Sequence, residues 1–211
     1  SYNTLEGVIP TSLYNCSRLV TLDLMSNRLV HGLPLELGSL SSLEMLVLSK
    51  NNISGKFPTS LGNLTSLSAL SIAYNHMDGE VPNTIGRLTH LMKLQISVNN
   101  LSGVFPPILY NLSSLRFLSM GGNLFSGNLR PGFGNMLTKL EELYLGGNSF
   151  SGDLPKTISS ISKITRLDVS ENHFTGNIPN SFGALQDMQY LGLVYNSFGN
   201  KLVGDLDFLS A

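Results

Sequence analysis

Four histidines and three neighbouring carboxylates are the residues of this chain with the most obvious capacity for chemistry. Such side chains bind transition metals or transfer protons when they converge in space. The histidines are His31, His76, His90 and His173, and the carboxylates are Glu142, Asp168 and Glu171. Whether they converge depends on how the chain is organised.

The chain is organised as a repeat with a period of 24 residues, as the spacing from Asn27 to Asn51 shows. An Asn recurs at this spacing, shifts by one residue after Asn123, and then resumes. The positions are Asn3, Asn27, Asn51, Asn75, Asn99, Asn123, Asn148, Asn172 and Asn196. Fixed self-similarity of this kind is the signature of a solenoid, in which each repeat forms one coil. We therefore expect one array of about eight coils over residues 1–211.

Each repeat follows the pattern L-x-x-L-x-L-x-x-N-x-L-S-G-x-h-P, seen clearly over residues 43–58 and 91–106. The alternating L-x-L segment predicts a short strand that pairs in parallel with the next coil. The Asn amide offers donors and acceptors, which predicts a buried ladder that satisfies backbone groups of two adjacent coils. The S-G-x-h-P segment predicts a bend. The last third predicts a short 3₁₀ or α-helical turn.

This pattern resembles the plant-specific leucine-rich repeats of cell-surface receptor kinases, over essentially the whole chain. The segments NCSRL, PTSLGNLTSL, FPPILYNLSSL and FSGNLRPGFGNML are similar to the ectodomains of the EF-Tu receptor subfamily. The predicted fold class is α/β. We expect a curved, superhelical leucine-rich-repeat solenoid with a parallel sheet on the concave face and short turns on the convex face.

The resemblance implies an extracellular, pattern-recognition segment of a plant immune receptor kinase that binds a microbial peptide or protein. It also implies a signal peptide, one membrane span and a cytoplasmic serine/threonine kinase outside these residues. A leucine-rich-repeat co-receptor kinase would bind mostly outside this segment. Neither end of the sequence shows a capping repeat, so we expect a piece of a longer ectodomain.

Composition argues against several other classes of partner. The net charge of −1, from 13 basic and 14 acidic residues, lacks the basic footprint of a protein that binds nucleic acid or an anionic membrane. No apolar run reaches the roughly 20 residues that cross a bilayer. The single cysteine, Cys16, excludes an internal disulfide. It takes the place of Leu64 and Leu112 in later repeats, so we expect a small buried hydrophobe.

The histidines do not converge in this arrangement. Only His76 and His173 share a phase, and four coils separate them by about 19 Å, at roughly 4.8 Å per strand. Nothing in the sequence removes the three carboxylates from solvent, and HExxH, GxSxG and phosphate-binding glycine motifs are absent. We predict no catalytic residue, metal or cofactor.

The outward strand positions and the turns that follow them line the predicted concave face. They are Thr21, Asp23, Met25, Met45, Val47, Lys50, Ala69, Ser71, Tyr74, Lys93, Gln95, Val98, Phe117, Ser119, Glu142, Tyr144, Arg166, Asp168, Glu171, Tyr190, Val194 and Tyr195. Exposed aromatics among variable polar residues are typical of peptide-binding surfaces. The predicted ligand contacts are Tyr74, Lys93, Gln95, Phe117, Glu142, Tyr144, Arg166, Asp168 and Tyr190.

Within this set the favoured cluster is Tyr144, Arg166, Asp168 and Tyr190, which places aromatic and charged groups on adjacent coils. The alternative is that these are scattered surface residues and that the ligand binds elsewhere. Arg166 and Asp168 could then simply pair with each other, a contact worth little at a surface.

Five N-x-S/T sequons predict glycosylation if the chain is secreted: Asn15, Asn52, Asn63, Asn100 and Asn111. None falls on the predicted strand face, which leaves that face free of glycan.

Four departures interrupt the pattern. His31 replaces the Gly of S-G, and Arg130 replaces the Pro, with Pro131 beside it. An extra residue lies near NMLTKL, and the pattern dissolves after Asn196. The last two indicate either structural tolerance or a bulging loop at a binding site.

Two other functions fit the same repeat. A secreted inhibitor of microbial cell-wall hydrolases would be a short array capped by disulfides at both ends, and a structural wall protein is a third possibility. A longer parent sequence with a membrane span and kinase motifs would favour the receptor.

Overall fold

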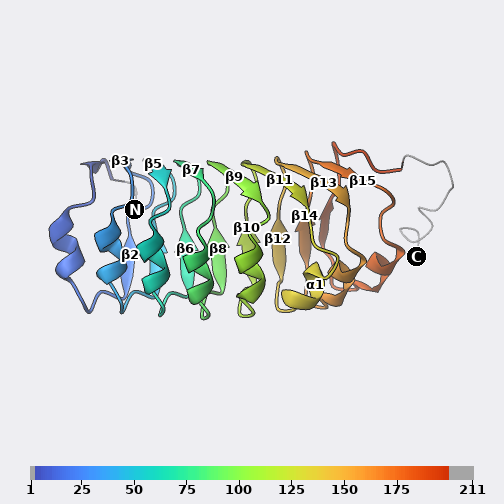
Figure 1. Cartoon of the computed structure of the whole chain (residues 1–211), viewed down its shortest axis with the longest axis horizontal. Coiled ribbons are helices and arrows are strands. Elements are labelled where there is room, and N and C mark those ends of the chain that lie inside the picture. Colours follow the sequence, from blue (N-terminus) through green and yellow to red (C-terminus); the bar gives the residue numbers. More distant parts are fainter. Residues whose placement is uncertain (1–2, 200–211) are drawn as a thin grey trace.

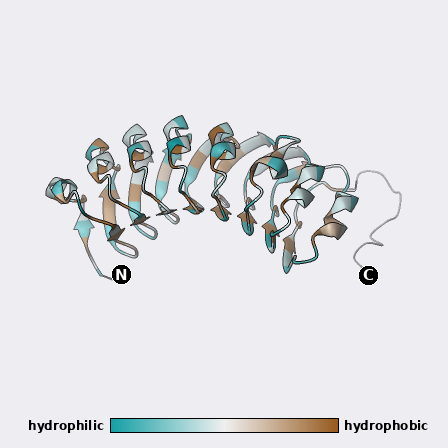
Figure 2. Ribbon diagram, turned by 90° about the horizontal axis from the view of Figure 1, so that it is seen from below, coloured by the Kyte–Doolittle hydropathy of each residue, from teal (hydrophilic) through white to brown (hydrophobic). Residues whose placement is uncertain are grey.

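The computed structural model describes residues 3–199 and shows a solenoid of stacked coils (Figure 1). Seen from a perpendicular direction, the coils follow an arc with the helical turns on its outer side (Figure 2). The expected curved α/β solenoid is confirmed. Positions 200–211, where the sequence pattern dissolves, lie outside the described residues.

Eight parallel strands, one from each coil, form the concave sheet. They are β2 (Thr21–Asp23), β4 (Met45–Val47), β6 (Ala69–Ser71), β8 (Lys93–Gln95), β10 (Phe117–Ser119), β12 (Glu142–Tyr144), β14 (Arg166–Asp168) and β16 (Tyr190–Gly192). The strands pair in register, so that Leu70, Leu94 and Leu118 lie side by side. These leucines are at most 1% exposed, and burying each side chain contributes about 1.5–3 kcal/mol.

The recurring Asn side chains form a continuous column beside this core. The Asn99 amide Nδ2 donates to the carbonyls of Ile96 in its own coil and Ile72 in the preceding coil, both at 3.1 Å. Its Oδ1 accepts from the Met77 N–H at 2.9 Å. The same pattern holds from Asn51 to Asn172, with each side chain at most 9% exposed. Asn3, at the N-terminal end, is exposed.

A short helical turn completes each coil on the convex side. The turns are the 3₁₀-helices η1 (Thr11–Asn15), η2 (Leu35–Ser39), η3 (Thr59–Asn63), η4 (Asn83–Arg87), η5 (Pro107–Asn111), η6 (Lys156–Ser160) and η7 (Asn180–Ala184), and the α-helix α1 (Phe133–Met136). The coil with the extra residue contains α1. An α-helical turn takes 3.6 residues instead of 3.0, so the insertion widens a convex turn and does not bulge on the concave face.

The segment after each ladder Asn forms a second sheet, which the sequence pattern did not predict. Its strands are β1 (Glu6–Gly7), β3 (Arg28–His31), β5 (Asn52–Lys56), β7 (His76–Gly79), β9 (Asn100–Val104), β11 (Leu124–Asn128), β13 (Ser149–Asp153) and β15 (His173–Thr175). They pair in parallel from coil to coil. The expected bend occurs inside these strands, where Gly55 and Gly103 adopt φ of +78° and +96°.

His31 occupies the place of these glycines and adopts φ of +68°. A left-handed backbone costs a residue with a Cβ roughly 1–2 kcal/mol. Glycine avoids that strain but loses about 0.5–1 kcal/mol of chain entropy on folding. We therefore expect His31→Gly to raise the free energy of unfolding by about 0.5–1 kcal/mol, measured by urea denaturation. The matched control is Val30→Gly, on the same strand, which should lower it; a loss in both variants would contradict the strain at His31.

Three positions differ from the sequence-based expectations. Cys16 is exposed, so the prediction of a buried side chain is wrong. Among the described residues η1 has a neighbouring helix on one side only, whereas Leu64 and Leu112, in the same place, are fully buried by coils on both sides. Ser71 and Ser119, expected at the concave surface, are each only 8% exposed because larger residues flank these short side chains on the adjacent strands.

Candidate functional site: an aromatic and charged cluster on the concave sheet

The in-register strands bring five of the predicted contact residues into one row. Lys93, Phe117, Glu142, Arg166 and Tyr190 follow one another across β8, β10, β12, β14 and β16. A second row, two residues further along each strand, contains Gln95, Tyr144 and Asp168. We call Lys93, Phe117, Glu142, Tyr144 and Arg166 the concave cluster.

The concave cluster is connected by direct side-chain contacts. The Lys93 Nζ lies 4.9 Å from the centre of the Phe117 ring, in cation–π geometry. The Phe117 and Tyr144 ring centres are 5.7 Å apart and tilted by 48°. The Tyr144 hydroxyl donates a hydrogen bond of 2.5 Å to Glu142 Oε2. Because each ring is held by a neighbour, this surface is ordered before any ligand arrives.

Burial is the main cause that raises the pKa of Tyr144 to about 12, followed by the hydrogen bond and the negative charge of Glu142. The positive charge and hydrogen bond of Arg166 act in the opposite direction.

The titration of Tyr144 gives a pH-dependent prediction. The folded chain holds the phenol proton more tightly than the unfolded chain does, whose tyrosines titrate near 10. The resulting stability is fully present below pH 10 and is lost as the pH rises through about 12. We expect Tyr144→Phe to remove one phenolate transition near pH 12 from the near-ultraviolet absorbance titration. A difference spectrum with its midpoint near 10 would contradict both the burial of the Tyr144 phenol and its hydrogen bond to Glu142.

Arg166 and Asp168 do not pair with each other. Over residues 3–199, the ion pairs within 4.0 Å are Arg28–Glu6 and Arg116–Glu141. Asp168 instead accepts hydrogen bonds from the N–H and the hydroxyl of Ser170. Arg166 is exposed beside the Tyr144 hydroxyl, so its charge is available to a ligand.

Two predicted tyrosines lie at different distances from the cluster. Tyr190 is 44% exposed and pairs in register with Arg166 at the end of the row. Tyr74 is 51% exposed on the turn after β6, with Lys50 Nζ 6.0 Å from its ring centre. Three strand spacings, roughly 14 Å, separate β6 from β12. The adjacent strand β8 carries Lys93, however, so Tyr74 lies beside the Lys93 end of the cluster, away from Tyr144 and Arg166.

Glycine pairs border the cluster, a feature that the sequence-based assignment of glycines to turns did not anticipate. Gly121 and Gly146 follow Ser119 and Tyr144 by two residues, on neighbouring coils. A Cβ at Gly146 would lie 3.3 Å from the Asp168 carboxylate carbon. Gly-Gly-Asn sequences occur in two consecutive repeats, at positions where other repeats carry larger residues. This sequence signal could have predicted that the backbone beside the cluster is left open by the missing side chains.

All five sequon asparagines are exposed and lie off the concave sheet. Asn15, Asn63 and Asn111 are the last residues of η1, η3 and η5. Asn52 and Asn100 begin β5 and β9 of the second sheet.

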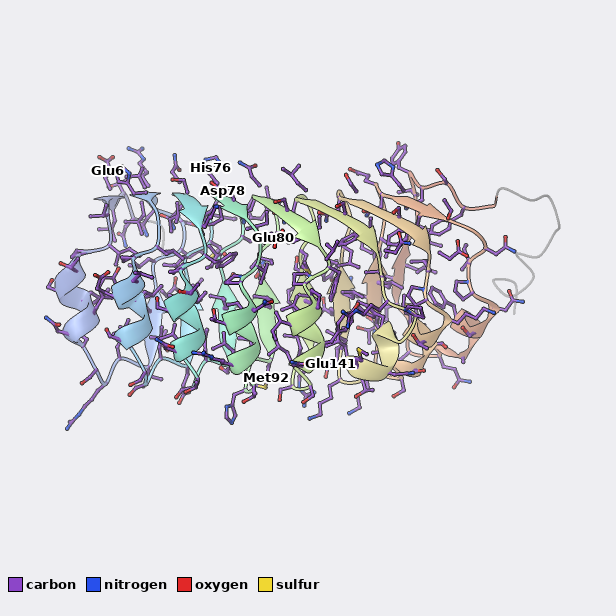
Figure 3. All side chains as sticks on the ribbon, viewed as in Figure 1. Glu6, His76, Asp78, Glu80, Met92 and Glu141 are labelled. Atoms are coloured by element: carbon purple, nitrogen blue, oxygen red, sulfur yellow. The ribbon has the colours of Figure 1, made fainter. Side chains whose placement is uncertain are left out.

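The described residues contain neither a metal-binding group of side chains nor a membrane-spanning helix. His76 begins β7 at one edge of the array, and Met92 and Glu141 mark the opposite edge (Figure 3). Within the described range, no group of three or more His, Cys, Asp or Glu side chains could hold a metal ion. No helix between residues 3 and 199 is long and apolar enough to cross a membrane.

Solved structures similar to this chain include plant receptors. The Arabidopsis receptor kinase HAESA, in complex with the peptide hormone IDA and the co-receptor SERK1, is 36% identical with a TM-score of 0.90, over 94% of this chain and 33% of that one. A TDR receptor is 31% identical with a TM-score of 0.90, over 93% and 34%. The plant peptide hormone receptor RGFR1, in complex with RGF2, is 31% identical with a TM-score of 0.88, over 92% and 31%.

The chain thus spans about a third of the length of these structures. No curated protein sequence matches it. Family profiles match almost all of the described residues: a leucine-rich repeat region over residues 3–143 and a leucine rich repeat over residues 138–198. With the coil geometry, the buried leucines and these matches, the chain belongs to the leucine-rich-repeat family.

Proposed function

We propose that this chain is a ligand-sensing segment of a plant receptor kinase ectodomain and that a peptide or protein ligand binds the concave cluster. The observation that carries the proposal is the contact chain Lys93–Phe117–Tyr144–Glu142 on a rigid, in-register sheet. Ordered aromatic rings bury a large area at low entropic cost, and Arg166 adds an exposed charge beside them. The segment itself is a binding module and not an enzyme.

The similar receptors support the class of ligand. HAESA was solved with a peptide hormone and a co-receptor, and the peptide hormone receptor RGFR1 was solved with RGF2. By analogy this chain would lie on the extracellular face of the plasma membrane, with a span and a serine/threonine kinase elsewhere in the full protein. A leucine-rich-repeat co-receptor kinase would contact mostly regions outside this segment.

The motifs that resemble the EF-Tu receptor subfamily support a finer proposal. The ligand is of microbial origin, and the full protein acts in innate immunity as a pattern-recognition receptor. The exposed Asn15, Asn52, Asn63, Asn100 and Asn111 would carry glycans that leave the concave sheet uncovered.

Binding of the chain to fractionated microbial peptides tests this function. We expect Tyr144→Ala and Arg166→Ala each to weaken binding about tenfold, which corresponds to about 1.4 kcal/mol. In both variants the residue is partly exposed, so the fold should persist.

A glycan added to the concave face provides an independent block. Ala69→Asn creates the sequon Asn-Leu-Ser on β6, where residue 69 pairs in register with Lys93. The glycosylated variant should lose binding, and Ala69→Gln, of similar size but without a sequon, should keep it. Unchanged affinity in the glycosylated variant, Tyr144→Ala and Arg166→Ala would show that the ligand does not use the concave cluster.

A further inference from the structure

A hollow of about 480 Å³ lies on the edge of the array where the chain passes from the convex turns into the concave strands. Met92 and Glu141, labelled in Figure 3, mark this edge. We call the hollow the basic hollow, after the residues that line its C-terminal part: His90, Met92, Ser114, Arg116 and Lys139.

Lys139 is the unpaired cation of the basic hollow. It is exposed, and over residues 3–199 no carboxylate lies within 4.0 Å of its ammonium group. Arg116 pairs with Glu141 through Nη1 alone, so its other guanidinium nitrogens have no partner in the same range. Glu44, at the far end of the hollow, is four strand spacings from Lys139, or about 19 Å, which exceeds the screening length of roughly 8–10 Å. Because Glu141 offsets Arg116, Lys139 leaves one net positive charge here.

An apolar side chain and a free hydroxyl lie beside this charge. Met92 is 45% exposed and offers apolar area next to the cations. The Ser114 hydroxyl makes no hydrogen bond to any described residue, so it can donate to a ligand. His90 Nδ1 lies 3.3 Å from the Thr65 carbonyl oxygen, which holds the imidazole ring at the wall of the hollow. One net positive charge, a free donor and an apolar surface suit a carboxylate on a short aliphatic stem.

The basic hollow is continuous with the concave cluster. Met92 directly precedes Lys93, and Arg116 directly precedes Phe117. Consecutive Cα atoms are about 3.8 Å apart, so the hollow begins one residue away from two members of the cluster. A peptide that lies on Phe117 therefore needs about three extended residues, roughly 10 Å of chain, to place a side chain beside Lys139.

We propose that the basic hollow binds a carboxylate of the peptide ligand, with Lys139 as its counter-ion. This inference rests on the proposed function, because the occupant is the ligand of the concave cluster. An Asp or Glu side chain and a free C-terminus both supply the group. An anionic polysaccharide fits less well, since a polyanion needs an uninterrupted basic row. Glu44 lies at one end of the hollow, and Glu142 and Asp187 line the next hollow along the same edge.

The probe is a soluble synthetic library of random dodecapeptides with free C-termini, selected on the folded wild-type chain. We expect the selected peptides to share a carboxylate about three positions from an aromatic or aliphatic residue. Lys139→Glu should weaken their binding about tenfold, because the reversed charge repels the carboxylate. The matched control is Lys156→Glu on η6, an exposed residue whose substitution changes the net charge equally and should leave the affinity unchanged.

A charge exchange tests whether the contact is direct. A selected peptide whose acidic residue is replaced by Lys should bind the Lys139→Glu variant more tightly than it binds the wild type, which a change in overall charge alone would not produce to the same extent in Lys156→Glu. Amidation of the C-terminus identifies the bound group: unchanged affinity assigns the carboxylate to a side chain, and weaker binding assigns it to the chain end.

Selected peptides without a shared carboxylate, equal effects of Lys139→Glu and Lys156→Glu, or no enrichment on the folded chain would overturn the proposal. If such peptides still lose binding in Tyr144→Ala, the concave cluster stands without the basic hollow. Peptides that lose binding in Lys139→Glu but not in Tyr144→Ala would support the hollow and contradict the concave cluster, so the two proposals fail separately. Binding of polygalacturonate that is lost in Lys139→Glu, with no acidic preference among the peptides, would assign the hollow to an anionic polysaccharide and overturn the peptide assignment.

Discussion

Replacing Asn99 by alanine is expected to lower the free energy of unfolding by about 3 kcal/mol, although this side chain touches no predicted ligand surface. The variant leaves the Met77 N–H buried without its acceptor, and an unsatisfied buried donor costs about 1–3 kcal/mol. The carbonyls of Ile72 and Ile96 lose one donor each but keep Asn75 and Asn123. Losing these second hydrogen bonds adds about 0.5–1.5 kcal/mol each at most. Urea denaturation followed by circular dichroism measures the loss.

Asn83 provides the matched control because it is an exposed asparagine on the next coil back, outside the column and outside any sequon. Asn83→Ala should change the free energy of unfolding by less than about 0.5 kcal/mol, as surface substitutions usually do. Equal effects of the two substitutions would mean that the amide column does not join the coils. If instead only Asn99→Ala is destabilising, we expect it also to weaken binding, because β8, which carries Lys93, frays.

The stacked strands of the concave sheet were predictable because every coil has to bury the same pattern of leucines. Leu94 and Leu118 share a phase, so a parallel, in-register strand stack follows from the spacing alone. The second sheet was not predictable in the same way. Strand β5, Asn-Ile-Ser-Gly-Lys, buries fully only Ile53 and carries a left-handed Gly55, so it lacks the alternation of apolar and polar residues that marks a strand.

The sequence predicted which residues of the candidate site lie in one row across the sheet, but not which of their side chains touch. The 24-residue spacing places Phe117, Glu142 and Arg166 on neighbouring strands. Which side chains touch depends on rotamers, which the spacing does not determine. Pairing of Arg166 with Asp168 was the alternative to a ligand role, yet Asp168 accepts hydrogen bonds from Ser170, and the Tyr144 hydroxyl donates to Glu142. Cys16 shows the same limit: it has the phase of Leu64, but within residues 3–199 η1 contacts a neighbouring helix on one side only.

The scaffold separates stability from recognition along each coil. The inward residues, the Asn column and the phenylalanines of the second sheet hold neighbouring coils together. The outward residues Lys93 and Arg166 are exposed, so substituting them removes no buried contact. This separation explains why the concave cluster contains residue types, such as Lys93 and Glu142, that no repeat position requires.

Replacing Phe150 by alanine is expected to have the largest effect on the array, about 3–5 kcal/mol, the usual cost of deleting a buried phenyl ring. Phe150 is fully buried on β13 and stacks between Phe125 and Phe174, with ring centres 6.2 and 6.3 Å away. In a solenoid the coils are coupled only to their neighbours. The cavity left by the deleted ring therefore weakens both interfaces of one coil at once. Unfolding in guanidinium should then occur in two transitions instead of one.

Hydrogen exchange locates the break. In Phe150→Ala we expect residues 173–198 to lose protection before residues 45–120 do, whereas in the wild type they should exchange together with the array. Phe150→Leu, which retains most of the apolar volume, should cost only about 1 kcal/mol and keep a single transition. A single cooperative transition in Phe150→Ala, with a loss below about 1 kcal/mol, would show that the stacked rings do not couple the coils. Because the same coil carries Glu142 and Tyr144 on β12, decoupling it should also weaken the binding proposed for the concave cluster, although no residue of that cluster is changed.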